Sequence, residues 1–129
     1  MTSISGQFAP NTPASSEAIA ALVADVVPME LSSDYLAFLR RANGGEGFIG
    51  GRYVILWRAE DVIASNRDYQ VGEFAPMLLL IGSNGGGEAY AFDRSRPGSR
   101  VFSVPFIGLD YREILSVSES FGSFVSPRQ

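Results

Sequence analysis

The side chains that carry out most enzyme chemistry are missing from this 129-residue sequence. It contains no histidine, no cysteine and no lysine, and all ten of its basic residues are arginines. These absences exclude a Ser-His-Asp triad, a cysteine nucleophile, a lysine Schiff base and metal sites built on imidazole or thiolate ligands. Carboxylates or tyrosines would have to do any acid–base work. The only adjacent acidic pair, Glu60–Asp61, stands where a predicted helix begins, and negative charge is favourable there. We therefore expect no catalytic residue, no metal and no cofactor, and we expect that the protein is not an enzyme.

A glycine pattern between residues 45 and 50 is the one motif that suggests a nucleotide. Gly45-Glu46-Gly47-Phe48-Ile49-Gly50 matches G-x-G-x-x-G. The dinucleotide-binding version of this motif leaves a strand and opens a helix, so that helix amides meet the pyrophosphate. Here the motif follows a predicted helix and leads into a predicted strand, which disfavours dinucleotide binding. It indicates a helix stop and a loop over residues 44–51, and contact with a partner remains a second interpretation.

Three further places carry residues suited to recognition, each with a plainer structural alternative. Ser83-Asn84-Gly85-Gly86-Gly87 is typical of a hairpin turn, although so many glycines could also form an amide-lined anion nest. Asp93 is either a turn cap or a contact residue. Trp57, the single tryptophan, belongs either to the core or to an interface, where tryptophan is enriched. The candidate partner-binding residues are Asn43, Gly44, Gly45, Glu46, Trp57, Asn84, Gly85, Glu88 and Asp93.

Charge and hydropathy restrict the partners. The net charge is −4, and the arginines form no basic stripe, so direct nucleic-acid binding is not expected. An acidic surface suits a basic protein partner, although the same charge also serves solubility. No apolar run approaches the roughly 20 residues that span a bilayer, and residues 1–11 lack the features of a signal peptide. With no cysteine to form disulfides, we expect a cytoplasmic protein.

The hydrophobic pattern predicts a single α+β domain, with a central antiparallel sheet and helices packed around it. Residues 1–13 are predicted to be a flexible N-terminal arm, and residues 14–129 the domain. Apolar residues spaced i, i+3, i+4, i+7 predict helices before Pro28 and over residues 33–42. A short helix with an acidic start is expected over 59–66, and an apolar stripe predicts a last one over about 110–126. Strands are expected at 53–57, 77–81, 88–93 and 101–105. The last three are joined by short turns and so pair antiparallel.

Several of these segments, in this order and spacing, resemble the SMI1/KNR4 (SUKH) family. Residues 33–45 form a capped helix with an aromatic and an apolar pair that ends in Asn43-Gly44-Gly45. Residues 55–62 hold an apolar-Trp57 step followed by an acidic helix start. Residues 79–93 hold an apolar strand, a glycine-rich turn and a strand that ends in Asp93. The likeness covers about residues 17–125, and it departs at Gly122, where the family usually has a larger and often acidic residue.

This resemblance implies an α+β fold without catalytic activity. Bacterial members are often immunity proteins that bind and neutralise co-encoded toxins, many of them nucleases, so a toxin domain is the protein partner that it implies. Contacts are then expected around the 44–51 loop, Trp57, the turn at 83–88 and Asp93. Fungal members are regulatory scaffolds in cell-wall signalling. A scaffold or regulator with a non-toxin partner is therefore the alternative, and a hydrophobic groove would favour it. The sequence does not determine the oligomeric state.

Overall fold

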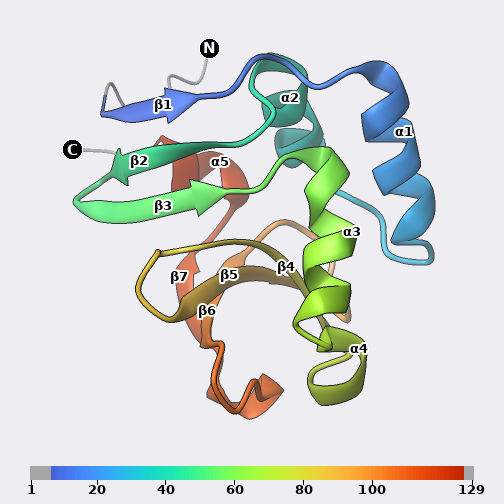
Figure 1. Ribbon diagram of the computed structural model, residues 1–129, viewed down its shortest axis with the longest axis vertical. Helices are drawn as coiled ribbons and strands as arrows, with labels where there is room; N and C mark the ends of the chain where they lie inside the picture. Colours follow the sequence, from blue (N-terminus) through green and yellow to red (C-terminus); the bar gives the residue numbers. More distant parts are fainter. Residues whose placement is uncertain (1–6, 127–129) are drawn as a thin grey trace.

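The computed structural model describes residues 7–126, and its centre is one seven-stranded antiparallel sheet (Figure 1). The strands lie side by side in the order of the sequence, from β1 to β7, so every neighbour in the sheet is also a neighbour along the chain. The strands are β1 Phe8–Pro10, β2 Gly45–Ile49, β3 Arg52–Leu56, β4 Leu78–Ser83, β5 Glu88–Asp93, β6 Val101–Pro105 and β7 Leu115–Ser118. The helices are α1 Ser16–Asp25, α2 Ser33–Arg41, α3 Ala59–Asp68, α4 Val71–Phe74 and α5 Phe121–Val125, with a 3₁₀ turn at Tyr111–Glu113.

Two apolar cores lie on the two faces of the central strands. Tyr90 and Phe92 of β5 join the larger core, which also contains the buried sides of α1, α2, α3 and α5. Ala89 and Ala91 of β5 point the other way, into a smaller core with Leu78, Leu80 and Val104. This arrangement follows from the alternation of side chains along a strand. It confirms the predicted α+β domain with helices packed around an antiparallel sheet.

Local signals explain most helix limits. The hydroxyl group of Ser15 accepts a hydrogen bond from the amide of Ala18, so α1 begins after Ser15. The α2 helix has Asp34 in its first turn and Arg40 and Arg41 in its last, as the helix dipole favours. Gly44, with a φ of 81°, follows the end of α2.

The predicted arm and the predicted glycine loop pair with each other instead. Phe8, Ala9 and Pro10 form β1, which lies antiparallel to β2 with Ala9 opposite Glu46. The prediction of a flexible arm is therefore wrong for residues 8–10, and residues 1–6 lie outside the described residues. The glycines of β2 make the pairing possible, because a Cβ atom at Gly45 or Gly47 would overlap the backbone of residues 7–10.

The predicted helix over residues 110–126 is also wrong. That segment contains the 3₁₀ turn, the strand β7 beside β6, and only then the five-residue helix α5. The side chain of Ser120 accepts a hydrogen bond from the amide of Ser123 and so begins α5. Apolar residues at nearly helical spacing thus come from two different elements.

Candidate functional site

A band of aromatic side chains lies on the outer face of the β2–β3 hairpin. Val54 and Leu56 of β3 are buried in the large core, so the alternating residues Tyr53 and Ile55 face the other way. Trp57, just past β3, is half-buried and packs against both cores. Phe48 of β2 lies opposite Tyr53, with the ring centroids 5.1 Å apart in an edge-to-face arrangement. Phe48 is 48% exposed. The hairpin therefore presents apolar rings on its surface.

The band continues across a stack of three rings from separate parts of the chain. Trp57 and Tyr69 lie parallel within 10°, with centroids 6.3 Å apart, and Tyr69 stacks on Phe106 at 4.4 Å. Trp57 follows β3, Tyr69 follows α3, and Phe106 follows β6. Ile107, next to Phe106, is 93% exposed. We call Phe48, Tyr53, Ile55, Trp57, Tyr69, Phe106 and Ile107 the aromatic surface.

The turn between β4 and β5 joins the two halves of the aromatic surface. At Gly85, a Cβ atom would stand 3.5 Å from both Ile55 and Tyr53, so this glycine lies directly against the hairpin. The carbonyl group of Gly87 accepts a hydrogen bond of 2.9 Å from the amide of Phe106. Asn84 holds the turn closed, since its side-chain oxygen accepts hydrogen bonds from the amides of Gly86 and Glu88 at 2.8 and 3.1 Å. The amides of Gly86 and Glu88 are therefore committed to the turn rather than open as an anion nest.

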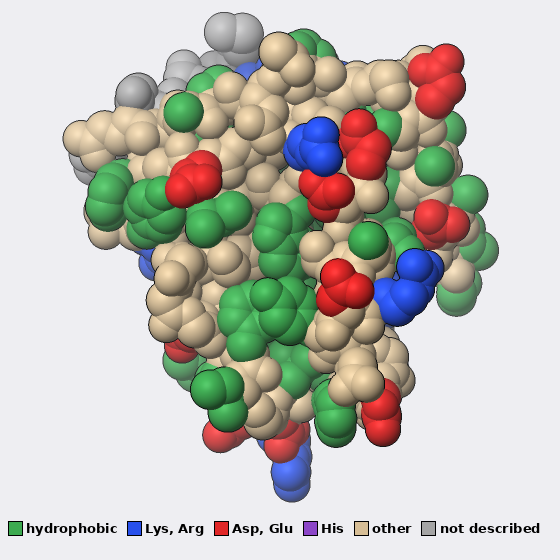
Figure 2. Space-filling view, viewed as in Figure 1, with side chains coloured by type: hydrophobic (Ala, Val, Ile, Leu, Met, Phe, Trp, Pro, Cys, Tyr) green, Lys and Arg blue, Asp and Glu red, His purple; other side chains and the backbone are tan. Residues whose placement is uncertain are grey.

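Acidic side chains border this surface. Figure 2 shows hydrophobic side chains gathered in the middle of the face that Figure 1 presents, with acidic side chains around them. Glu46 accepts a hydrogen bond from the hydroxyl group of Tyr53, and this bond raises the pKa of Tyr53. Asp61 is paired with Arg58 at 2.9 Å. An apolar centre with a charged rim is the usual anatomy of a protein–protein interface.

Five of the predicted contact residues come together here. Glu46 and Trp57 belong to the outer face of the hairpin, and Asn84 and Gly85 belong to the turn beside it. Glu88 lies at the end of the same turn, where its carboxylate accepts a hydrogen bond of 3.4 Å from the Asn84 side chain. Glu46 and Gly85 are exposed, whereas Trp57, Asn84 and Glu88 are half-buried.

Asn43 is buried and has a structural task. Its side-chain oxygen accepts a hydrogen bond of 2.7 Å from the amide of Ala59, and its side-chain nitrogen donates one of 2.7 Å to Glu60. Its backbone bonds Asn11 and Thr12. Asn43 thus ties the end of α2 to the start of α3, and the bond to Glu60 lowers the pKa of that carboxyl group.

Gly44, Gly45 and Asp93 are likewise buried. Asp93 accepts hydrogen bonds from the amide and hydroxyl groups of Ser95 at 2.9 and 2.6 Å and from the hydroxyl of Tyr111 at 2.6 Å. Burial by itself would raise the pKa of Asp93, but these bonds and the nearby Arg96 lower it below its usual value. Asp93 therefore caps its turn, which is one of its two predicted roles.

Tyr69, Phe106 and Ile107 were not singled out from the sequence. Tyr69 stands just past a predicted helix, and the other two follow a predicted strand, so no periodic pattern includes them. The isolated Phe106-Ile107 pair before Gly108 is the one signal that could have indicated exposed apolar residues in a turn.

Within residues 7–126, no three acidic side chains come close enough together to hold a metal ion. None of the helices in that same range is long and apolar enough to cross a bilayer.

Comparison with known proteins assigns the chain to a family. The model of the SMI1 / KNR4 family (SUKH-1) matches residues 13–126, which takes in every helix and all strands except β1. A comparison with curated proteins gives no match. Since the family model spans nearly the whole sequence, from the approach to α1 through the end of α5, this chain belongs to the SMI1/KNR4 (SUKH-1) family.

Proposed function

We propose that this chain is a non-catalytic protein-binding domain that neutralises a co-encoded toxin by covering its functional surface. The stack of half-buried Trp57 and Phe106 with exposed Tyr69, beside the exposed Ile107, is the observation that carries this proposal. Soluble proteins seldom leave such a group of large apolar side chains uncovered without a partner. Aromatic anchors also dominate the energetics of many interfaces.

Charge and composition support the same role. The acidic residues around the aromatic surface and the net charge of −4 would attract a basic partner and orient it during encounter. Many nuclease surfaces are basic because they must bind nucleic acid. The absence of histidine, cysteine and lysine from the sequence supports inhibition by occlusion rather than by chemistry on the partner.

The test begins with the reading frame immediately upstream of this one in the source genome. That frame is expressed with and without this protein, and growth is scored. We expect the neighbour to be toxic alone and harmless in the presence of this chain. A harmless neighbour would contradict the immunity proposal.

A variant at Ile107 then tests the surface itself. Ile107→Asp places a charge at a side chain that is 93% exposed, so the fold should be unaffected. Binding measured by calorimetry is expected to weaken about tenfold to a hundredfold, in the range of an interface hot spot. The control is Val27→Asp, at a residue that is 68% exposed in the segment between α1 and α2. Equal affinity of the two variants would mean that the toxin binds elsewhere.

An apolar groove on α1 favours a second candidate, a scaffold or regulator with a non-toxin partner. The groove has a volume of about 530 Å³ and is lined by Ala14, Ile19, Ala20, Val23 and Arg40, among others. Ala20→Arg blocks it at an exposed position. If this substitution abolishes binding of a cellular partner while Ile107→Asp has no effect, the scaffold proposal replaces the immunity proposal.

A further inference from the structure

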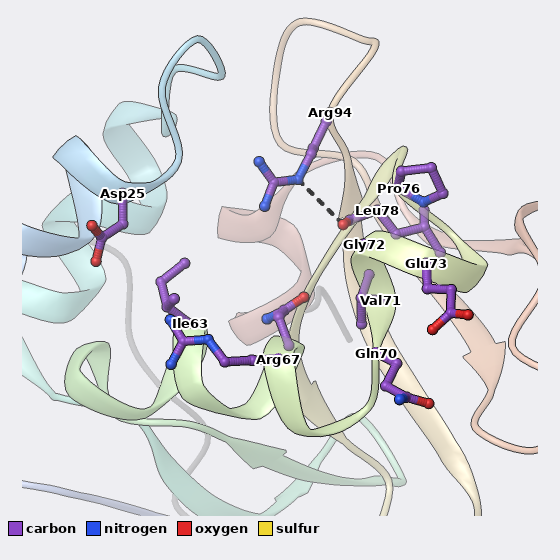
Figure 3. Close-up of a pocket in the computed structure, with 11 residues that line it drawn as sticks. Asp25, Ile63, Arg67, Gln70, Val71, Gly72, Glu73, Pro76, Leu78 and Arg94 are labelled. Carbon is purple, nitrogen blue, oxygen red and sulfur yellow. Dashed lines mark hydrogen bonds between the residues drawn. The ribbon is translucent and has the colours of Figure 1, made fainter.

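A pocket of about 450 Å³ lies between α1, α3, α4 and the end of β5, at a site separate from the aromatic surface (Figure 3). Its apolar lining includes Ile63, Val71 and Leu78. Two arginines, Arg67 and Arg94, and the carboxylate of Asp25 also line it. This volume falls in the range of small-molecule sites. We call it the arginine pocket.

Arg94 is held in place without a counter-charge. It follows β5, where its backbone amide donates to the carbonyl of Met77 at 2.6 Å, and its Nε donates to the carbonyl of Leu78 at 3.3 Å. No carboxylate within residues 7–126 lies within ion-pair distance of it. Burial lowers the pKa of its guanidinium group. A partly buried charge with no partner is unfavourable. An anion bound beside Arg94 would offset this cost.

Arg67 supplies a second guanidinium group from α3. In Figure 3, Arg94 and Arg67 approach the space between α1 and α3 from two sides, and Asp25 faces it from the end of α1. Glu73 also lines the pocket, but its carboxylate is turned outward in the same view. By contrast, Arg58, Arg96 and Arg112 each form an ion pair within the described chain.

The wall between the two arginines is held together by hydrogen bonds of Asn66. Asn66 is buried, and its side chain bonds the backbone of Leu80 in both directions, at 2.8 and 2.9 Å, and donates to Val62 at 2.7 Å. These bonds fix α3 on β4. The backbone that carries Arg67 is thereby attached to β4, the strand that bonds Arg94, and such preorganisation favours binding.

We propose that the arginine pocket binds a small ligand through an oxyanion, either a phosphate or a carboxylate, held between Arg94 and Arg67. The planar guanidinium groups suit two oxygens at once. The rest of the ligand lies on Ile63, Val71 and Leu78. The carboxylate of Asp25 also lines the pocket, and it repels the anion and so lowers its affinity. The proposal is independent of the toxin-binding function.

Three probes with one ring and different head groups test this site: phenyl phosphate, benzoate and phenol. They are titrated into the full-length protein at constant ionic strength, and the amide resonances of Arg67, Val71 and Arg94 are followed by NMR. We expect saturable shifts with at least one of the two anions and none with phenol. Whichever of phenyl phosphate and benzoate binds with the higher affinity identifies the oxyanion as phosphate or carboxylate. Shifts that are no larger than with phenol would overturn the proposal.

Variants locate the anion. Arg94→Gln is expected to weaken the tighter anion about tenfold or more, and Asp25→Asn to strengthen it. Arg67→Gln, at an exposed side chain, gives a second loss variant if Arg94→Gln is poorly folded. Arg40→Gln removes an equal charge outside the pocket and should leave the affinity unchanged. Equal weakening by Arg40→Gln and Arg67→Gln would show only general attraction between charges and would refute a specific site.

Discussion

Tyr35 lies in the middle of an aromatic cluster, and its hydroxyl group has no hydrogen-bond partner among the described residues. Its ring packs edge-to-face on Phe92 and Phe121, with centroids 5.1 and 5.0 Å apart. Burial raises the pKa of Tyr35 well above its usual value, so the hydroxyl stays neutral. The ring stabilises the core, whereas the hydroxyl group costs free energy because it has lost water without gaining a partner.

We predict that Tyr35→Phe is neutral or raises the free energy of unfolding by about 1 kcal/mol. Tyr90→Phe is the matched control, since its hydroxyl donates a hydrogen bond of 3.2 Å to the carbonyl of Tyr53. That substitution should lower the free energy of unfolding by about 1 kcal/mol. Urea denaturation of the two variants measures both changes, and a loss of stability in Tyr35→Phe would show that its hydroxyl is bonded after all.

Asp34 joins three parts of the chain through its carboxylate. One oxygen accepts hydrogen bonds from Ser32 and the amide of Tyr35, at 2.6 and 2.8 Å. The other accepts from Ser99 and the amide of Gly122, at 2.7 and 3.0 Å. Burial raises the pKa of Asp34, but the four hydrogen bonds outweigh it and leave the pKa below its usual value. Gly122 lies in the first turn of α5, and its amide donates a hydrogen bond to this carboxylate.

This pKa makes part of the stability dependent on pH. Because the pKa of Asp34 is lower in the folded than in the unfolded state, its contribution is present above about pH 5 and is lost as the pH falls through the folded value. Asp34→Asn should lower the free energy of unfolding at pH 7 by about 1–3 kcal/mol and should make the loss between about pH 5 and 3 shallower. Asp68→Asn removes an exposed charge as the control, and unfolding at several pH values provides the measurement. An unchanged slope in Asp34→Asn would refute the linkage.

At the scale of elements, the pairing of β1 with β2 depends on glycine. A Cβ atom at Gly47 would overlap the carbonyl oxygen of Gln7 and approach Phe8 to 2.8 Å. Gly47 also has a φ of 149°, which other residues rarely adopt. The strand β1 can therefore approach only because this position has no side chain.

We predict that Gly47→Ala lowers the free energy of unfolding by more than about 2 kcal/mol, or releases β1 from the sheet. Gly51→Ala separates the two causes, because Gly51 also has a positive φ, of 79°, but has nothing within 4 Å of a Cβ atom. It should cost only the backbone strain, about 1–2 kcal/mol. Hydrogen exchange of the β1 amides distinguishes release from global destabilisation. Equal effects of the two substitutions would exclude the close approach.

The sequence predicted elements well where one pattern belongs to one element. Glu88–Asp93 and Val101–Pro105 have the predicted limits, because large and small side chains alternate or a short apolar run is bounded by turns. The strand at Gly45–Ile49 was missed because strand propensity disfavours glycine, although the partner strand requires it. The last segment was predicted as a helix because Ile114, Val117, Phe121 and Phe124 have nearly helical spacing, but β7 ends at Ser118, before α5 begins.

At the scale of the molecule, the candidate site is assembled from parts that lie far apart in the sequence. Glu46, Trp57 and the turn at Asn84 could be predicted because they carry local signals. Tyr69 and Phe106 could not, because only tertiary packing brings them onto Trp57. Asn43 and Asp93 look like contact residues in the sequence, but the structure commits their side chains to hydrogen bonds in the interior.

The net negative charge should affect the rate constant for association with a partner. With a net charge of −4 and a basic partner, we predict that raising NaCl from about 50 to 500 mM lowers the association rate constant about tenfold or more. The dissociation rate constant should change little, because the rim charges are exposed. Surface plasmon resonance, with a partner identified by the growth test immobilised, measures both constants. A salt effect on dissociation alone would contradict steering by charge.

The pairing of β1 also determines how the sheet ends. Asn11 donates its amide to the carbonyl of Gly44 at 2.9 Å, and in an antiparallel pair successive amides point to opposite sides. The amide position of Pro10 therefore faces away from β2, at the edge of the sheet as formed by residues 7–126, and proline has no hydrogen to offer there. With only three residues and a missing donor, this edge is a poor template for a strand from another copy. Copies of this chain are thereby kept from joining edge to edge into fibres, and Pro10→Val should make concentrated solutions aggregate.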